Sequence, residues 1–169
     1  MLPYTICFIK KNHHLLLLNR RKAPTMGLWN GVGGKIEKNE TPSESIIRET
    51  FEETGIKLES VTYAGNAHFH SQHGKSGMYI FIADLPDGMN LYTPLNTVEG
   101  ILDWKPIEWI LDKENRGVIG NLQKFLPEIL DGNIYLEHKF VYEHHQLQSY
   151  TSFPLVDREA DKMRLLVNR

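Results

Sequence analysis

The sequence predicts an α/β (α+β) fold, in which short strands and two helices build one domain. Apolar runs of strand length occur around polar turns, and two longer segments have the spacing of amphipathic helices. The chain has 169 residues, 41% of them hydrophobic, which is of single-domain size with an ordinary core. We therefore expect one domain over residues 1–153, followed by a tail over 154–169.

Seven strands are expected from the short apolar runs, which are bounded by glycine or polar residues. The polar stretch 71–77 is expected to join the third strand to the fourth, and the segment that leads from the second strand to the glycine-rich stretch 31–34 is expected to be a loop. The predicted strands cover 4–9, 15–19, 60–69, 78–83, 102–107, 134–142 and 147–153.

A helix over 42–54 is predicted from the chemistry of its two ends. Thr41 has the hydroxyl of an N-cap, and Pro42 follows at the first helical position, where a missing N–H costs nothing. Glu44 stands where the carboxylate of a capping box reaches back to the N–H of the cap. Gly55 is suited to the left-handed conformation that ends a helix.

The two faces of this helix differ in chemistry. The side chains of Ile46, Ile47 and Phe51 are expected to pack inward. The other face carries three carboxylates at positions i, i+3 and i+4. Their like charges repel, and a bound divalent cation turns this repulsion into attraction. The alternative is a solvated acidic face on which Arg48 forms an i,i+4 pair. The carboxylates with this spacing are Glu49, Glu52 and Glu53.

A second helix is predicted over 115–130. Its apolar residues recur at helical spacing, although Pro127 lies among them, and turn-forming residues at 131–133 end it. The predicted inward stripe consists of Val118, Leu122, Phe125, Leu126, Ile129 and Leu130.

The region around the first helix resembles the sequence box of the Nudix hydrolases, Gly-x5-Glu-x7-Arg-Glu-U-x-Glu-Glu-x-Gly-U, where U is a bulky aliphatic residue. Many specified positions over a fixed span make a chance match improbable. Thr50 departs from the pattern, and we expect it on the inner side of the helix with its hydroxyl bonded to the preceding turn. The matching residues are Gly34, Glu40, Arg48, Glu49, Glu52, Glu53, Gly55 and Ile56.

The resemblance implies a mixed β-sheet sandwiched between helices, and the order of the expected elements extends it over most of the chain. It also implies a hydrolase of phosphorus-containing anhydrides with Mg²⁺ as cofactor, for which Mn²⁺ can substitute. Carboxylate oxygens are the hard ligands that these ions prefer. A catalytically silent domain of the same family, which senses a nucleotide, is the non-enzymatic alternative.

The resemblance assigns the metal to the carboxylates of the predicted helix and to one backbone carbonyl, that of the residue before the box glycine. Related MutT-type enzymes carry a further acidic residue ahead of a later strand, which acts as a metal ligand or as the base that activates water. In this chain that residue is Glu99, for which a charged loop residue is the alternative. The implied metal ligands are Gly33, Glu49, Glu52, Glu53 and Glu99.

Other residues are implied around the metal. Glu40 and Arg48 would brace the loop and orient the metal-binding carboxylates. Arg48 therefore joins the helix carboxylates and Glu99 as a catalytic residue. Lys35 is a candidate phosphate contact, and Arg20 is a candidate for the substrate entrance. For both of these basic residues, a solvated surface side chain is the alternative.

The stretch 28–35 resembles the Trp-Asn-Gly-x-Gly-Gly-Lys of the mammalian oxidised-purine nucleoside triphosphatases. This implies that Asn30 hydrogen-bonds the edge of a purine, and an asparagine in a turn before glycine is the alternative. Those enzymes carry paired aspartates for the base near position 118, where this chain has Val118 and Ile119. Asn115 is a candidate replacement.

The implied reaction is hydrolysis of 8-oxo-dGTP or a related nucleoside triphosphate to the monophosphate and pyrophosphate, which cleanses the nucleotide pool. The same box serves Nudix enzymes that cleave nucleotide sugars, ADP-ribose, dinucleoside polyphosphates or the 5′ end of RNA, because the metal site recognises only the diphosphate. These substrates remain alternatives.

The composition limits which partners and which cell compartment we expect for the protein. A net charge of −2 gives no sign of binding to long nucleic acid. The single cysteine, Cys7, excludes an intrachain disulfide, and no signal-peptide pattern or membrane-length apolar run is present, so we expect a cytoplasmic protein.

The segment 157–169 mixes charged and apolar residues. It is expected either to dock as a short helix on the domain or on a second subunit of a homodimer, or to fray.

Overall fold

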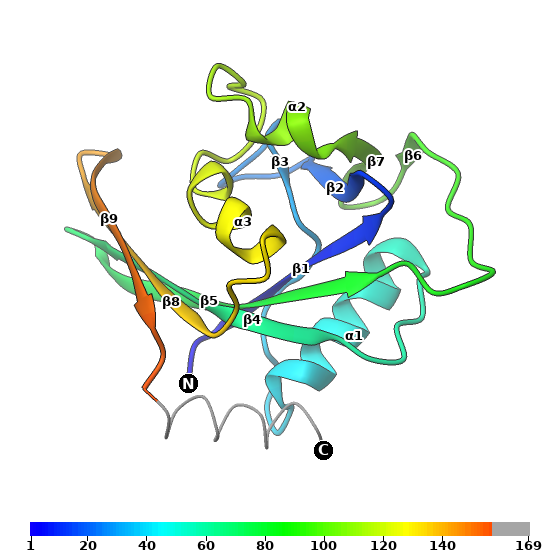
Figure 1. Ribbon diagram of the computed structural model, residues 1–169, viewed down its shortest axis with the longest axis horizontal. Coiled ribbons are helices and arrows are strands. Elements are labelled where there is room, and N and C mark those ends of the chain that lie inside the picture. Colours follow the sequence, from blue (N-terminus) through cyan, green and yellow to red (C-terminus); the bar gives the residue numbers. More distant parts are fainter. Residues whose placement is uncertain (157–169) are drawn as a thin grey trace.

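One mixed sheet with helices on both of its faces forms the core of the protein (Figure 1). The computed structural model describes residues 1–156. Within them the strands are β1 (Tyr4–Lys11), β2 (His14–Arg20), β3 (Trp29–Asn30), β4 (Thr62–Ser71), β5 (Gly74–Asp84), β6 (Leu95–Asn96), β7 (Gly100–Pro106), β8 (Leu136–Glu143) and β9 (Gln146–Pro154). The helices are α1 (Pro42–Thr54), α2 (Ile107–Leu111) and α3 (Leu122–Leu130).

The strand order across the sheet is β6-β7-β2-β1-β5-β4-β8-β9, and β3 pairs with β2 outside this path. The pairs β1–β5 and β4–β8 are parallel, and the other pairs are antiparallel. Helix α1 lies against one face, whereas α2 and α3 lie against the other (Figure 1). This mixed sheet between helices confirms the predicted fold class.

Strand alternation divides the apolar side chains between two cores. On β1, Cys7 faces the core that contains Ile46 of α1, whereas Phe8 faces the core that contains Phe125 of α3. All four side chains are completely buried. Because β1 lies between the two cores, it fixes the position of the glycine-rich stretch beside it: the N–H of Cys7 donates to the carbonyl of Val32 over 2.7 Å.

The two ends of α1 confirm the predicted caps. The Thr41 hydroxyl accepts the N–H of Glu44 over 3.2 Å, and the Glu44 carboxylate accepts the N–H of Thr41 over 2.8 Å. Gly55 ends the helix in the left-handed conformation, with φ of 74°. Local chemistry alone was sufficient to place these boundaries.

The predicted inward face of α1 is partly wrong. Ile46 is completely buried and Ile47 packs at the edge of the core, but Phe51 is 55% exposed. The sheet-facing row of the helix continues from Ile46 to Thr50 and Thr54, which are four residues apart and buried. Thr50 therefore lies on the inner side, as expected.

The expected hydrogen bond of the Thr50 hydroxyl is absent from the described part of the chain. Its Oγ1 is buried and has no hydrogen-bond partner there. The hydroxyl of Thr54 makes the bond instead, since it donates to the carbonyl of Thr50 over 2.6 Å. The Thr50 hydroxyl thus opposes burial at a position where the family pattern has an aliphatic side chain.

The second predicted helix begins later than expected, at Leu122 instead of residue 115. The preceding residues pair with β3: the N–H of Trp29 donates to the carbonyl of Gly117 over 2.8 Å, and the N–H of Ile119 donates to the carbonyl of Trp29 over 3.1 Å. Val118 is buried as predicted, but in this bridge and not on a helix. Backbone pairing across the molecule therefore overrode the local helical spacing.

Several strand boundaries also differ from the predictions. The stretch 71–77 is not a loop, because β4 and β5 continue to Ser71 and from Gly74 around a two-residue turn. The strand expected over 102–107 runs from Gly100 to Pro106, and Ile107 begins α2, which was not predicted. The short strands β3 and β6 were missed as well.

The end of the described chain extends the predicted domain slightly. Strand β9 reaches Pro154, and Leu155 is buried, with its N–H donating to the carbonyl of Tyr135 over 2.9 Å. Of the described tail residues, Leu155 therefore belongs to the core, and the predicted docking helix over 157–169 lies outside the described residues.

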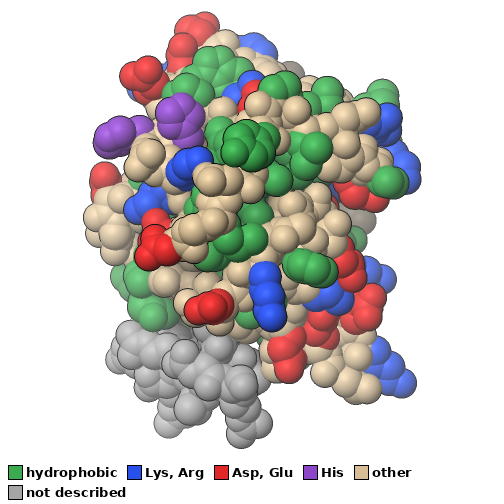
Figure 2. Space-filling view, turned by 90° about the vertical axis from the view of Figure 1, so that its right-hand side faces the viewer, with side chains coloured by type: hydrophobic (Ala, Val, Ile, Leu, Met, Phe, Trp, Pro, Cys, Tyr) green, Lys and Arg blue, Asp and Glu red, His purple; other side chains and the backbone are tan. Residues whose placement is uncertain are grey.

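The surface has no strong bias toward one charge on the face shown in Figure 2. In the lower right part of that view, acidic and basic side chains lie beside one another, in keeping with the net charge of −2. Among residues 1–156, no helix has the length and apolar character needed to cross a membrane.

Candidate active site

A cleft of about 560 Å³ gathers most of the predicted site residues. Its walls come from the ends of β1 and β2, the glycine-rich stretch, α1 and the segment before β7. Arg48 and Glu40 are not part of its lining, but Arg48 contacts Glu49 and Glu52, which are, and Glu40 contacts Arg48. The predicted site residues that line it are Arg20, Asn30, Gly33, Lys35, Glu49, Glu52, Glu53 and Glu99.

The glycine-rich stretch and α1 approach each other closely inside the cleft. A Cβ atom on Gly34 would lie 2.6 Å from the Glu49 carboxyl carbon, so a larger residue would displace this carboxylate. The N–H of Thr5 on β1 donates to the carbonyl of Gly34 over 2.9 Å and holds the stretch against the sheet. Glycine at position 34 thus leaves room for the Glu49 carboxylate beside the backbone.

Arg48 binds Glu40 through two parallel hydrogen bonds. Nε donates to Oε1 of Glu40 over 2.7 Å, and Nη2 donates to Oε2 over 2.9 Å. The bonds to Arg48 hold the pKa of Glu40 below its usual range, and Glu40 in turn raises the pKa of Arg48. Glu40 also accepts the N–H of Glu37 over 2.9 Å, so this pair ties the loop before α1 to the helix.

The same guanidinium reaches the acidic face of α1. Nη1 of Arg48 donates to Glu49 over 2.8 Å and to Glu52 over 3.2 Å. The i,i+4 pair with Glu52, foreseen as the alternative, therefore exists beside the bond to Glu40. Arg48 draws the two carboxylates together and reduces their mutual repulsion.

The surroundings of Glu53 favour the protonated form of its carboxyl group. Burial, and to a smaller extent the neighbouring charges of Glu49 and Glu99, raise the pKa of its carboxyl, which lies at about 7 in total. The N–H of Gly33, which donates to Oε2 of Glu53 over 2.9 Å, and the charge of Arg20 act in the opposite direction. Near neutral pH, Glu53 thus exchanges its proton readily.

The chemistry of this wall fits a divalent cation. Across residues 1–156, no three His, Cys, Asp or Glu side chains already converge as in a closed metal site. The carboxylates of the cleft are nevertheless hard oxygen donors, and the pKa of Glu53, raised mainly by burial, is raised also by the charges of Glu49 and Glu99, which a cation would offset. The carbonyl of Gly33, whose N–H is already bonded, adds an oxygen donor in the same cleft.

A second hollow of about 500 Å³ adjoins the cleft and shares Thr25, Asn30 and Met78 with it. Sequence spacing gave no signal for this hollow, because its walls come from segments far apart in the chain. Asn121, at the start of α3, contributes a buried Oδ1 with no hydrogen-bond partner in the described part. Its other walls include Phe69, His73, Ile119, Tyr142, His144 and His145.

Two asparagines with predicted base contacts have different surroundings. Oδ1 of Asn30 accepts the N–H of Gly31 over 2.9 Å, which is the turn contact foreseen as the alternative, and Asn30 lines both the cleft and the hollow. Asn115 is used in its own turn: Nδ2 donates to the carbonyl of Trp109 over 2.7 Å, and Oδ1 accepts the N–H of Gly117 over 2.9 Å.

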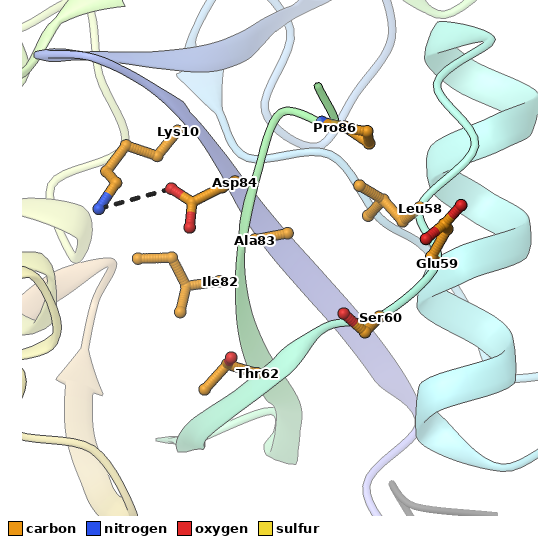
Figure 3. A pocket seen from close by; sticks show the side chains of 9 residues that line it. All are labelled: Lys10, Leu58, Glu59, Ser60, Thr62, Ile82, Ala83, Asp84 and Pro86. Atoms are coloured by element: carbon orange, nitrogen blue, oxygen red, sulfur yellow. Dashed lines mark ion pairs between the residues drawn. The ribbon is translucent and has the colours of Figure 1, made fainter. Parts of the chain in front are cut away.

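A smaller hollow of about 300 Å³ is lined by the end of β5 and by the segment between α1 and β4 (Figure 3). Lys10 and Asp84 point toward each other across one side of it, with 3.6 Å between Nζ and Oδ1. It contains none of the predicted site residues, so the cleft and its adjoining hollow remain the candidate active site.

Comparison with known proteins identifies relatives of several specificities. The chain is 32% identical over 88 residues to the NAD-capped RNA hydrolase NudC of Haemophilus influenzae, which covers 51% of this chain but only 33% of that protein. It is 30% identical to the uncharacterized Nudix hydrolase YvcI of Bacillus subtilis, over 82% of this chain and 85% of YvcI. It is 28% identical to the oxidized purine nucleoside triphosphate hydrolase of Mus musculus, over 63% and 67% of the two chains.

Solved structures share the fold. A MutT protein from Bacillus halodurans has a TM-score of 0.72 at 25% identity, over 90% of this chain and 98% of that one. The NUDIX domain of Shewanella oneidensis NrtR, solved with ADP ribose, has a TM-score of 0.61 at 16% identity over 78% and 88% of the two chains, which supports the fold alone. The NUDIX domain model matches residues 2–125, so the chain belongs to the Nudix family, whose members are hydrolases that act on pyrophosphate bonds.

Proposed function

We propose that this protein hydrolyses 8-oxo-dGTP or a related purine nucleoside triphosphate to the monophosphate and pyrophosphate, with Mg²⁺ as the cofactor. The observation that carries the proposal is the continuity between the acidic cleft and the adjoining hollow, which meet at Asn30. One nucleotide extends naturally over both: its phosphates belong at the carboxylates, and its base belongs in the hollow. The likeness to the mouse enzyme supports this choice of substrate.

The residues that would hold the metal are the α1 carboxylates, Glu99 and the carbonyl of Gly33. A bound Mg²⁺ supplies neutralisation of phosphate charge and a lower pKa for a coordinated water. Lys35 and Arg20 are exposed in the cleft lining and are suited to bind phosphate oxygens. Glu40 and Arg48 act on the carboxylates by orienting them, because Arg48, which is bonded to Glu40, donates to Glu49 and Glu52.

The reaction breaks the bridging P–O bond of the anhydride as water forms a new P–O bond. The water proton passes to a carboxylate of the cleft, and the pyrophosphate leaves with the electron pair of the broken bond. Glu53 and Glu99 are the candidates for the proton acceptor. Both carboxylates line the cleft.

The hollow is suited to a purine because its walls combine aromatic rings with a hydrogen-bond donor and a hydrogen-bond acceptor. Phe69 and Tyr142 offer rings for stacking. The amide nitrogen of Asn30 is a donor with no partner among the described residues, whereas the Oδ1 of Asn121 is an acceptor that is buried in the wall and has no partner there either. A purine edge presents an acceptor next to a donor, which complements this pair.

The alternative is a Nudix hydrolase of another nucleoside diphosphate derivative. The likeness to the NAD-capped RNA hydrolase NudC favours it, and the open hollow accepts a nucleoside of either kind of substrate. ADP-ribose, a dinucleoside polyphosphate and the 5′ end of RNA belong to this class, and a silent nucleotide-sensing domain would bind without turnover.

The test is to incubate the purified protein with Mg²⁺ and a panel of substrates, and to identify the products by chromatography. The panel contains 8-oxo-dGTP, dGTP, ATP, ADP-ribose, a diadenosine polyphosphate, NAD-capped RNA and triphosphorylated RNA. A marked preference for 8-oxo-dGTP, with pyrophosphate as product, is expected. Turnover mainly of ADP-ribose or RNA would replace the proposed substrate, and Mg²⁺-dependent binding without product would indicate the silent domain.

A further inference from the structure

The segment that carries Glu99 has little apolar packing to hold it. Val98 is 80% exposed and Leu95 is 37% exposed, although Glu99 itself lines the cleft. A segment of this kind is held by polar contacts or moves freely. The position of the Glu99 carboxylate therefore depends on the hydrogen bonds that tie the segment to the sheet.

Part of the order of this segment is internal. The N–H of Thr97 donates to the carbonyl of Gly100 over 2.7 Å, and the N–H of Gly100 donates to the Thr97 hydroxyl over 3.2 Å. A Cβ on Gly100 would lie 2.0 Å from the carbonyl oxygen of Asn19, so β7 can begin beside β2 only with glycine at this position. These contacts and the pairing of β6 with β7 shape the turn, and a separate anchor ties it to the end of β2.

Arg21 supplies that anchor at both ends of the turn. Its N–H donates to the carbonyl of Glu99 over 2.9 Å. Its guanidinium donates to the side chain of Asn96 and, over 3.1 Å, to the carbonyl of Thr97. Arg21 therefore binds the segment through its backbone at Glu99 and through its side chain at Asn96 and Thr97.

Arg20 and Arg21 have different tasks although they are adjacent. Arg20 lines the cleft, and its charge acts on Glu53, whereas the Arg21 guanidinium is engaged with the turn. Successive side chains at the end of a strand point to opposite sides, which explains this division. Arg21 is not part of the cleft lining, so its action on the site runs through Glu99.

We infer that Arg21 is a positioning residue, which holds the turn 96–99 so that the Glu99 carboxylate completes the cation-binding wall of the cleft. This inference rests on the proposed function of Glu99 as a metal ligand or base. Arg21 itself contacts neither substrate nor metal.

The experiment measures Mn²⁺ affinity by electron paramagnetic resonance, without substrate, together with kcat and the Mg²⁺ concentration for half-maximal activity. Arg21→Gln is expected to weaken Mn²⁺ binding about tenfold and to raise the Mg²⁺ requirement by a similar factor. Asn96→Ala, which removes one acceptor of the same guanidinium, is expected to have a smaller effect in the same direction. The matched control is Lys22→Gln, which removes an exposed positive charge next to Arg21 and is expected to leave both values unchanged.

The second arm places Arg21→Gln in a Glu99→Gln background. Since Arg21 acts through Glu99, no further loss of Mn²⁺ affinity is expected there. An equal loss in both backgrounds, or no loss in either, would overturn the inference. If Glu99→Gln alone leaves affinity and turnover intact while Glu52→Gln abolishes turnover, the inference fails and the proposed hydrolysis stands. If Glu52→Gln also has full activity, the proposed function itself fails.

Discussion

The N–H of Gly33 donates to Oε2 of Glu53 over 2.9 Å and joins the glycine-rich stretch to the acidic face of α1. The bond favours the ionised carboxylate, whereas burial and the charges of Glu49 and Glu99 favour the protonated one, and the net effect raises the pKa to about 7. Glu53 is thus a carboxyl group whose charge at neutral pH depends on what enters the cleft.

This pKa predicts a pH dependence of stability without metal. The folded protein holds a proton on Glu53 up to about pH 7, whereas the unfolded chain releases it near 4.5. The stabilisation is therefore complete below pH 4.5 and is lost as the pH rises through about 7, at a cost of roughly 1–3 kcal/mol. The measurement is urea denaturation in EDTA at pH 5 and pH 8.

Glu53→Gln is the control for this measurement, because it keeps the shape of the side chain but does not titrate. The stability of the native protein relative to the variant is expected to fall between pH 5 and pH 8. Adding Mg²⁺ at pH 8 is expected to stabilise the native protein more than the variant. A difference that is the same at both pH values would contradict the assigned pKa.

Arg48 and Glu40 are expected to behave as one unit. Arg48→Lys loses the two parallel bonds, and Glu40→Gln loses the charge that they require, so each change should lower the free energy of unfolding by about 1–2 kcal/mol and reduce kcat. The double variant should be hardly worse than either single variant, because both remove the same contact. Fully additive losses in urea denaturation would show that the two residues act independently.

Asn30 and Asn121 are expected to determine base preference. Asn30→Ala or Asn121→Ala should lower kcat/KM for the preferred purine triphosphate about tenfold or more, because each removes one hydrogen bond to the base. The rate with a substrate that lacks this base should change little, since the phosphate contacts remain. The check is kcat/KM for 8-oxo-dGTP and for a pyrimidine triphosphate, and equal losses for both would argue against base recognition in the hollow. Asn115→Ala serves as the control, since its amide is bonded within its own turn.

Thr50→Val is expected to stabilise the protein by about 1 kcal/mol. The buried Oγ1 of Thr50 has no hydrogen-bond partner among the described residues, so a methyl group of the same size removes an uncompensated polar atom. The midpoint of urea denaturation should rise while turnover stays near the native value. A clear loss of stability would show that the hydroxyl has a partner, such as a buried water.

The success of the sequence predictions depended on how local their causes were. Both ends of α1 follow from Thr41, Glu44 and Gly55, which act within a few residues of the helix. The cleft could be foreseen because most of its carboxylates belong to this one helix. Residues of other elements, such as Glu99, needed the family resemblance to be placed beside it.

The failures have long-range causes. The second helix starts at Leu122 because Gly117 and Ile119 pair with Trp29, about ninety positions earlier in the chain. Likewise, the hollow beside the cleft combines Phe69 and Asn121, which no spacing along the chain connects. Phe51 was misplaced because the sheet-facing row of α1 continues from Ile46 into Thr50 and Thr54, whose hydroxyl side chains the apolar pattern does not register.

The most direct test of the catalytic role of the α1 carboxylates is the rate of pyrophosphate release at saturating Mg²⁺ by the native protein and by Glu52→Gln, with circular dichroism as a check of folding. Glu52 is exposed on α1, so its replacement leaves the core untouched. We expect a folded variant whose kcat is lower by about a hundredfold or more. A folded variant with near-native kcat would contradict the assignment of the α1 carboxylates as the catalytic wall of this cleft.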